Sequence, residues 1–203
     1  QRQMCIRDSI HAIGDAAVDF AIESLEKAVD RYGEPAMPHR IEHGGIVRPD
    51  QMERLRGKPI VVVPQPLFIK AFGDAMADAL GPERAAWSYP GKRLLDADLI
   101  LPGSSDQPVA PGVPLEIMQA AIERRTETGR DYGPADRLTP EEALYAYTAG
   151  SAAATGWAGR KGQVIPGQLA DFVLLSADPL TTVLSTISVA ATIVGGELRY
   201  GSF

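Results

Sequence analysis

The feature that most constrains the fold is a short apolar run, "PIVVVPQP" (residues 59–66), in which four β-branched side chains follow one another between prolines. An unbroken apolar run of this length is typical of a strand that is buried on both of its faces. The run "LILPGSSD" (residues 99–106) begins in the same way, so it is predicted to be another buried strand. Such strands occur in sheets that helices cover on both sides, which makes an α/β fold the first expectation.

Helical periodicity in the intervening segments supports this expectation. Between residues 18 and 29 apolar residues recur every three or four positions, which predicts an amphipathic helix with Asp15 as its N-cap and Gly33 at its end. A polar, glycine-containing stretch after residue 66 is predicted to be a loop, in which Trp87 and Tyr89 either cover a pocket or pack in the core. Further helices are predicted at "PDQMERLRG", "GKRLLDAD" and "PLEIMQAAIERRTETG". Strands that alternate with helices indicate a parallel sheet, either open or closed into a barrel.

The C-terminal part of the chain follows a different pattern. The segment "RLTPEEALYAYTAGSAAATG" predicts helix without an intervening strand, and Thr139 with Glu142 three residues later forms a capping box. The chain then becomes rich in strand-forming residues, and "GQVIPGQLADFVLLSADPL" and "ATIVGGELRYG" are predicted to be short strands around glycine turns. The second of these segments is predicted to be a hairpin through Gly195 and Gly196. We therefore expect a small separate β module at this end.

Charge and composition exclude several classes of function. A net charge of -6 over 203 residues, without a cluster of Lys and Arg, argues against nucleic acid as a partner. No apolar run approaches the length of a membrane-spanning helix, so a membrane partner is not expected either. We expect a soluble protein with a cytoplasmic location. The opening "QRQMCIRDS" (residues 1–9) has no structural periodicity and no apolar core, so we interpret it as a leader that is not native to the protein.

The segment "HRIEHGG" begins at His39 and contains two histidines and a carboxylate. In a helix, His39 and His43 would share one face and bind one ion, with Glu42 as a base. Pro38 and the two glycines leave room for barely one helical turn, and because nucleation of so short a helix is costly, they favour a strand. In a strand the two histidines lie about 13 Å apart, at roughly 3.3 Å per residue, so only one of them can bind a given ion.

The position of chemistry in parallel α/β folds selects between the two histidines. Because functional residues collect at the carboxyl ends of the strands, we expect His43 to be the ligand. The segments "IHAIGD" and "LILPGSSDQPV" place His11 and Asp106 at two further strand ends. Imidazole and carboxylate together suit Zn²⁺ or a similar ion. The alternatives are that His43 is a hydrogen-bonded histidine beside a glycine turn and that Asp106 caps its own loop.

Five segments taken together carry a resemblance to a known family: "HAIGDAAVDFAIESLE", "HRIEHGG", "PGSSDQPV", "RLTPEEALYAYTAGSAAATG" and "KGQVIPGQLADFVLLSADPL". They resemble the metal-dependent amidohydrolase superfamily, in its family-3 or YtcJ-like branch. The resemblance implies a (β/α)₈ barrel and a small β-sandwich to which the chain ends return. Residues 10–158 would then be the C-terminal half of the barrel, and residues 159–203 a segment of the sandwich.

The resemblance also implies an activity and roles for single residues. Similar enzymes hydrolyse carbon–nitrogen bonds of non-peptide amides with one or two divalent ions, Zn²⁺ being the expected metal. Metal ligands equivalent to His11, His43 and Asp106 are implied, and Asp106 is also the expected catalytic proton carrier. Gln65 either forms a hydrogen bond with the substrate or caps the backbone beside Pro66.

The sequence departs from this family in one respect. The family's metal site also uses a His-x-His pair on the first strand and commonly a bridging lysine carbamate or other acidic ligand on an intermediate strand, and neither is present here. We therefore interpret the chain as the C-terminal half of the enzyme, inactive by itself, with the missing N-terminal half as its partner. Assembly into a homo-oligomer is left open. The rival interpretations are a non-catalytic relative that binds or regulates, and an inert truncation product.

Overall fold

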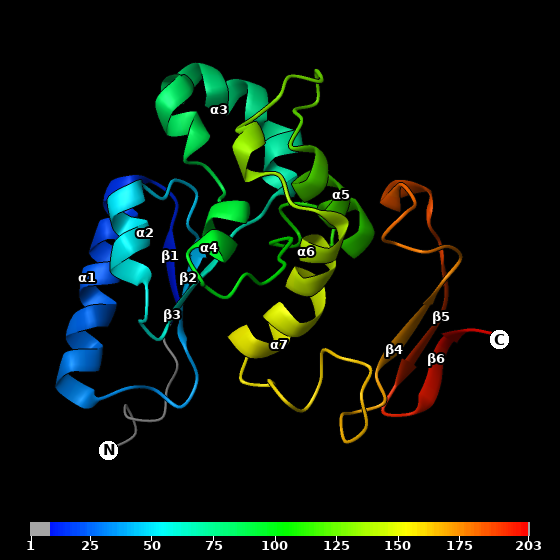
Figure 1. The fold of residues 1–203 in the computed structure, drawn as a ribbon. Coiled ribbons are helices and arrows are strands. Elements are labelled where there is room, and N and C mark those ends of the chain that lie inside the picture. Colours follow the sequence, from blue (N-terminus) through cyan, green and yellow to red (C-terminus); the bar gives the residue numbers. More distant parts are fainter. Residues whose placement is uncertain (1–8, 203) are drawn as a thin grey trace.

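The computed structural model describes residues 9–202 and contains two three-stranded sheets with helices between them (Figure 1). The first sheet is parallel and consists of β1 (Ser9–Ala12), β2 (His39–His43) and β3 (Ile60–Val63), side by side in chain order. The connections are α1 (Asp15–Tyr32) and α2 (Pro49–Leu55). Because the three strands run in the same direction, their carboxyl ends lie at one edge of the sheet. The predicted parallel α/β arrangement is confirmed, whereas closure into a barrel stays a prediction.

The leader that the sequence predicts at residues 1–9 lies, except for Ser9, outside the described residues. Ser9 is the first residue of β1 and pairs in register with Arg40.

The two faces of the parallel sheet differ in character, because the pleat directs neighbouring side chains to opposite sides. On one face Ile41 and Val62 are buried in a hydrophobic cluster that includes the apolar side of α1. On the other face Ser9 and Arg40 both donate hydrogen bonds to the Glu42 carboxylate. All four residues of β3 are buried, as its sequence predicts. This face also carries the buried Val61 and Val63 of β3, and it is the one that carries His11, which pairs in register with Glu42.

The start of α1 differs from the prediction. Gly14 rather than Asp15 is the N-cap residue, because Asp15 is already part of the helix and its carboxylate forms an ion pair with Arg84. An acidic side chain in the first turn still interacts favourably with the helix dipole. The predicted end of the helix is confirmed, since Gly33 has a φ of 85° and its N–H donates to the carbonyl of Val29.

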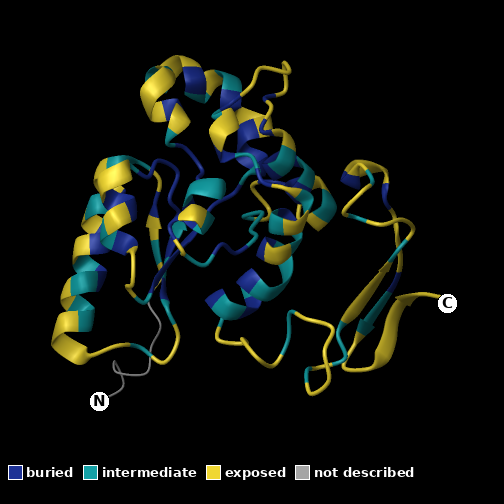
Figure 2. Ribbon diagram, viewed as in Figure 1, coloured by how far each residue is buried: buried dark blue, intermediate teal, exposed yellow. Residues whose placement is uncertain are grey.

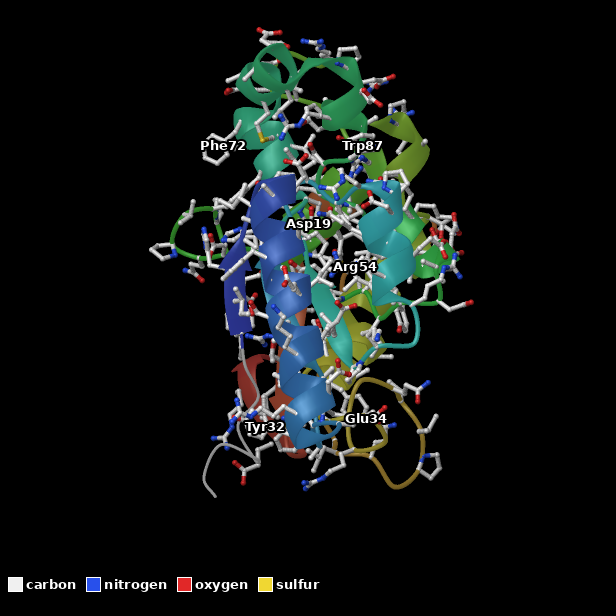
Figure 3. The ribbon with its side chains drawn as sticks, turned by 90° about the vertical axis from the view of Figure 1, so that its left-hand side faces the viewer. Asp19, Tyr32, Glu34, Arg54, Phe72 and Trp87 are labelled. Atoms are coloured by element: carbon white, nitrogen blue, oxygen red, sulfur yellow. The ribbon has the colours of Figure 1, made fainter. Side chains whose placement is uncertain are left out.

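Polar contacts hold α2 against α1, as Figure 3 shows for Asp19 and Arg54. The carboxylate of Asp19 accepts hydrogen bonds from Arg48 at 2.8 Å and from Arg54 at 3.2 Å. A hydrogen bond with Gln51 and these two guanidinium groups hold the pKa of Asp19 below its ordinary value. Gln51 is fully buried, and its amide group accepts from the Arg48 N–H and donates to the Asp15 carbonyl.

A long helix, α3 (Leu67–Ala86), occupies much of the stretch for which the sequence predicts a loop. The helix is interrupted at Gly81, where φ is 72°, and such a break in the pattern conceals the helical periodicity. Phe68 in its first turn is buried, and its ring centroid lies 5.8 Å from that of Tyr89. Of the two alternatives for the aromatic residues, core packing therefore holds for Tyr89, while Trp87 is only half-buried.

The remaining predicted helices are present. They are α4 (Lys92–Asp96), α5 (Pro114–Glu123) and a rod of three consecutive pieces, α6 (Pro140–Tyr145), a π-helical segment (Ala146–Gly150) and α7 (Ser151–Ala154). None of the helices between residues 9 and 202 is long and apolar enough to cross a membrane.

Residues 99–106 do not form the predicted strand. The N–H of Leu99 donates to the carbonyl of Leu94, and the N–H of Gly103 donates to the carbonyl of Ala146 in the π-helical segment. Pro102 has no N–H to donate. Because these donors are bound to helices or missing, the segment has no ladder with β3 in the described part of the chain.

The second sheet is antiparallel and consists of β4 (Phe172–Leu175), β5 (Val189–Val194) and β6 (Glu197–Gly201). The predicted hairpin is confirmed: Gly195 and Gly196 connect β5 to β6 with φ of 61° and 83°, values that suit a two-residue hairpin turn. Figure 2 shows that most of this sheet is exposed, in contrast to β3. Its membership of a β-sandwich stays a prediction.

The capping box at the start of α6 provides a first test. The Thr139 hydroxyl accepts from the Glu142 N–H at 3.2 Å, and the Glu142 carboxylate accepts from the Thr139 N–H at 2.9 Å. We expect Thr139→Ala to lower the free energy of unfolding by about 1 kcal/mol, the usual cost of losing such a cap. Chemical denaturation measures this, and Thr139→Ser, which retains the hydroxyl, serves as the control. Equal losses in both variants would contradict the capping role.

Candidate functional site

The structure brings the three predicted metal ligands together at the carboxyl edge of the parallel sheet. His11 lies in β1, His43 is the last residue of β2, and Asp106 follows residues 99–103 in a loop. The imidazole rings of His11 and His43 are 4.4 Å apart between centroids, and His43 Nε2 lies 4.0 Å from Asp106 Oδ2. The strand interpretation of "HRIEH" is confirmed and the helical alternative is wrong, since His39 lies at the opposite end of β2.

Backbone geometry explains how His43 reaches this cluster. By strand alternation its side chain would point away from the face that carries His11, but its φ of 74° lies in the left-handed region and breaks the alternation. Asp106 has a left-handed φ of 58° as well. Such conformations cost about 1–3 kcal/mol in non-glycine residues and cluster at functional sites. The glycine after His43 is required sterically, because a Cβ on Gly44 would overlap the side chain of Val62.

The His43 ring is almost completely enclosed. It is 5% exposed, its Nδ1 lies 2.8 Å from Gln65 Oε1, and the ring centroid of Phe68 is 6.1 Å away. Gln65 is itself 1% exposed and donates hydrogen bonds to the Val63 carbonyl and to the Ser104 hydroxyl. The predicted substrate-binding role of Gln65 is therefore not visible in its contacts and stays a prediction.

Asp106 is positioned by the π-helical segment rather than by a neighbouring strand. In the wide turn of this π-helical segment, the Ala146 carbonyl accepts hydrogen bonds from the Gly103 N–H at 2.8 Å and from the Ser151 hydroxyl at 2.7 Å. Two glycines permit this close approach, because a Cβ on Gly103 would overlap the Tyr147 ring and one on Gly150 the Leu101 carbonyl. π-Helical turns occur frequently at functional sites. In the sequence, the signal for this π-helical turn is the glycine inside an otherwise helical pattern.

The donor set suits a divalent cation such as Zn²⁺, since it offers two imidazoles and one carboxylate. The separation of 4.0 Å between His43 Nε2 and Asp106 Oδ2 is longer than a hydrogen bond. Within residues 9–202, however, no group of three or more His, Cys, Asp or Glu side chains is arranged so that it could hold a metal ion. The three residues suit a metal by the chemistry of their donor atoms, and their role as ligands stays a prediction.

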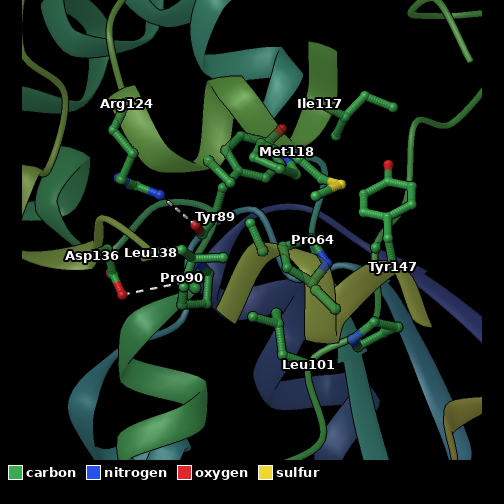
Figure 4. A pocket seen from close by; sticks show the side chains of 17 residues that line it. Pro64, Tyr89, Pro90, Leu101, Ile117, Met118, Arg124, Asp136, Leu138 and Tyr147 are labelled. Carbon is green, nitrogen blue, oxygen red and sulfur yellow. Dashed lines mark hydrogen bonds between the residues drawn. The ribbon is translucent and has the colours of Figure 1, made fainter. Parts of the chain in front are cut away.

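A small apolar cavity is lined by Pro64 and Pro66, the two prolines that flank Gln65, and does not include the candidate site. Figure 4 shows Pro64, Leu101, Met118 and Tyr147 around the cavity, whose volume of about 20 Å³ holds one water-sized sphere. Neither the candidate ligands nor Gln65 line it. We assign it to core packing between the sheet and the helices.

A buried arginine on the rim of this cavity fixes the loop after α3. The guanidinium of Arg124 donates to the carbonyl of Tyr89 at 2.8 Å, as Figure 4 shows, and to that of Ser88 at 2.9 Å. Burial lowers the pKa of Arg124 to about 10 and raises that of Tyr89 to about 12, so both groups keep their ordinary protonation states near neutral pH. No signal in the sequence identifies Arg124 as buried.

Parallel strands that carry two histidines at their carboxyl ends, with an aspartate from a loop beside them, define an α/β protein with polar residues gathered at the strand ends. The chain belongs to the amidohydrolase family, whose model it matches over residues 6–200.

Individual relatives agree with this membership. The Bacillus subtilis amidohydrolase YtcJ is 28% identical over 98% of the chain and 38% of its own length. N-substituted formamide deformylase from Arthrobacter pascens is 31% identical over 95% of the chain and 36% of its own length. The crystal structure of an uncharacterized metal-dependent hydrolase from Pyrococcus horikoshii is 32% identical, with a TM-score of 0.76 over 89% of this chain and 36% of that one. The chain thus spans slightly more than a third of the length of each of these three relatives.

Proposed function

We propose that the protein to which this chain belongs is a metal-dependent hydrolase that acts on carbon–nitrogen bonds of non-peptide amides. The observation that carries the proposal is the convergence of His11, His43 and Asp106 at one edge of the parallel sheet. Family membership supports the reaction class, and the N-substituted formamide deformylase among the relatives supports a small amide as the substrate. The metal-dependent hydrolase from Pyrococcus horikoshii supports the metal.

In this proposal His11, His43 and Asp106 hold a divalent ion, with Zn²⁺ as the expected metal. The bound ion supplies Lewis acidity, which favours deprotonation of water and polarises the carbonyl of the amide. Further ligands come from the part of the family's length that this chain does not span, so the choice between one and two ions stays open.

Asp106 is the proton carrier in this mechanism. Its carboxylate is 39% exposed at the edge of the site, so it is accessible to water and to a substrate. It takes a proton from the attacking water and delivers it to the departing nitrogen, which leaves as an amine rather than as an unstable amide anion. His43 and Phe68 enclose the inner side of the site and limit the access of bulk water there.

The proposal includes the predicted division of the family fold. Residues 10–158 contribute to the barrel and residues 159–203 to the β-sandwich, where the apolar row of Phe172, Ile193 and Leu198 across β4, β5 and β6 is available for packing. The partner of both parts is the remainder of the same protein. Homo-oligomerisation and a cytoplasmic location stay predictions.

The test uses the full-length protein that contains this chain. We expect stoichiometric divalent metal in the purified protein and hydrolysis within a panel of N-substituted formamides and other small amides. Dialysis against a chelator removes the ion on which the mechanism depends, so turnover should fall to background and return when Zn²⁺ is added.

Two results would contradict the proposal. Turnover that survives complete removal of the metal excludes a metal-dependent mechanism. A folded protein that binds metal at full stoichiometry but hydrolyses no amide of the panel favours the non-catalytic binding relative instead.

A further inference from the structure

Gln65 is the residue in closest polar contact with His43, and it is as deeply buried as any polar side chain near the site. Its Oε1 lies 2.8 Å from His43 Nδ1, and its Nε2 lies 2.7 Å from the Val63 carbonyl oxygen and 3.3 Å from the Ser104 hydroxyl. A glutamine with 1% exposure that uses both ends of its amide on protein atoms has a specific structural task.

These contacts determine which way the amide points. A backbone carbonyl can only accept a hydrogen bond, so the atom of Gln65 that faces the Val63 carbonyl must be the NH₂ group. The other end, which faces His43 Nδ1, is therefore the carbonyl oxygen. Because that oxygen can only accept as well, Nδ1 of the imidazole must carry the proton. In the neutral ring Nε2 then has the free lone pair, on the side where Asp106 lies 4.0 Å away.

The backbone around Gln65 keeps this arrangement rigid. Pro64 and Pro66 flank the residue, and a residue before proline is restricted to extended conformations. The Gln65 carbonyl accepts from the Phe68 N–H at 3.1 Å in the first turn of α3. The backbone of Gln65 is thus held by α3, and its side chain is held by the Val63 carbonyl of β3.

We propose that Gln65 is a positioning residue that holds His43 in the tautomer protonated on Nδ1 and so presents the Nε2 lone pair for metal binding. The inference rests on the proposed function for the claim that Nε2 binds a metal ion. The tautomer itself depends only on contacts within this chain. Partners of this kind typically contribute 10–100-fold to metal affinity, because they orient the imidazole and fix its protonated nitrogen.

The first measurement needs no variant. In the metal-free full-length protein, at a mildly alkaline pH, ¹⁵N NMR distinguishes the two neutral tautomers of His43. We expect the resonances of a ring protonated on Nδ1. A ring protonated on Nε2 would overturn the proposal, whatever the protein's activity.

The second measurement is the affinity for Zn²⁺. Gln65→Met keeps the length of the side chain and removes both hydrogen-bonding groups, so we expect a mixture of His43 tautomers and a loss of about 10–100-fold in affinity. The matched control is Gln51→Met, because Gln51 is also fully buried and bonded through both ends of its amide, but to Arg48 and Asp15. It should lower the melting temperature without changing tautomer or affinity.

The two variants separate positioning from general stability. Unchanged tautomer and affinity in Gln65→Met, or an equal loss of affinity in Gln51→Met, would contradict the positioning role. Absence of Zn²⁺ binding by the wild-type protein would instead contradict the proposed function and leave the tautomer as measured by NMR. The failures of the two proposals are therefore distinguishable.

Discussion

In the full-length protein, His43→Ala should abolish stoichiometric metal binding, whereas His39→Ala should retain it. The reason is the orientation of β2, which places His43 beside His11 and Asp106 and places His39 at the other end of the strand. Loss of a ligand should exceed the 10–100-fold effect of removing a ligand's hydrogen-bonding partner. Metal analysis of the purified variants measures the difference.

His39 is a demanding control because it is as buried as His43, each being 5% exposed. Both variants are therefore expected to lose thermal stability, and melting curves recorded beside the metal content separate this effect from ligand loss. Equal metal loss in the two variants at comparable stability would show that the carboxyl end of β2 is not the metal-binding end.

Asp106→Asn should lower kcat by about 10²–10⁴-fold, the range that general acid–base groups contribute. Asparagine keeps the shape of the side chain and one oxygen, and it tolerates the left-handed backbone at this position, where φ is 58°. We therefore expect most of the metal and the melting temperature to be preserved. Steady-state kinetics, metal content and melting curves of the same preparation form the test.

The matched control is Asp98→Asn, because Asp98 has the same φ of 58° and is exposed outside the site. It should leave kcat unchanged. The alternative role of Asp106 as a cap of its loop finds no support in the described contacts, in which the Ser105 hydroxyl and the Asp106 backbone carbonyl accept the loop's hydrogen bonds. Near-normal turnover of Asp106→Asn with the metal retained would exclude this residue as the proton carrier.

The parts of the fold that could be predicted are those governed by local pattern. Periodicity identifies α1, the capping box identifies the start of α6, and the paired glycines identify the β5–β6 hairpin. The strand interpretation of residues 39–43 is confirmed, whereas the choice of His43 rather than His39 as the ligand, made from the rule that chemistry lies at the carboxyl ends of strands, stays a prediction. These features depend on few residues that are close in the sequence, so single-sequence reasoning reaches them.

The predictions that failed have one physical cause in common: the residues concerned bind partners that are distant in the sequence. Residues 99–106 have the composition of a strand, but the Gly103 N–H is bound by a carbonyl more than forty residues away. Asp15 has the character of a cap, but it pairs with Arg84. The contact of Gln65 with His43 was likewise invisible, because it depends on the lateral order of β2 and β3.

The π-helical segment gives the site an unusual dependence on helix length. The Gly103 N–H donates to the Ala146 carbonyl. The position of the chain before Asp106 therefore depends on where the helical segment places that carbonyl. Deleting one residue between positions 146 and 150 would restore regular winding and shift the Ala146 carbonyl and the Ser151 hydroxyl, the two acceptors of the Gly103 N–H. Changes in the length of the loop after Asp106 would not move the contact between Gly103 and Ala146. A single-residue change in the length of this helical segment would thus move Asp106 without replacing any residue of the candidate site.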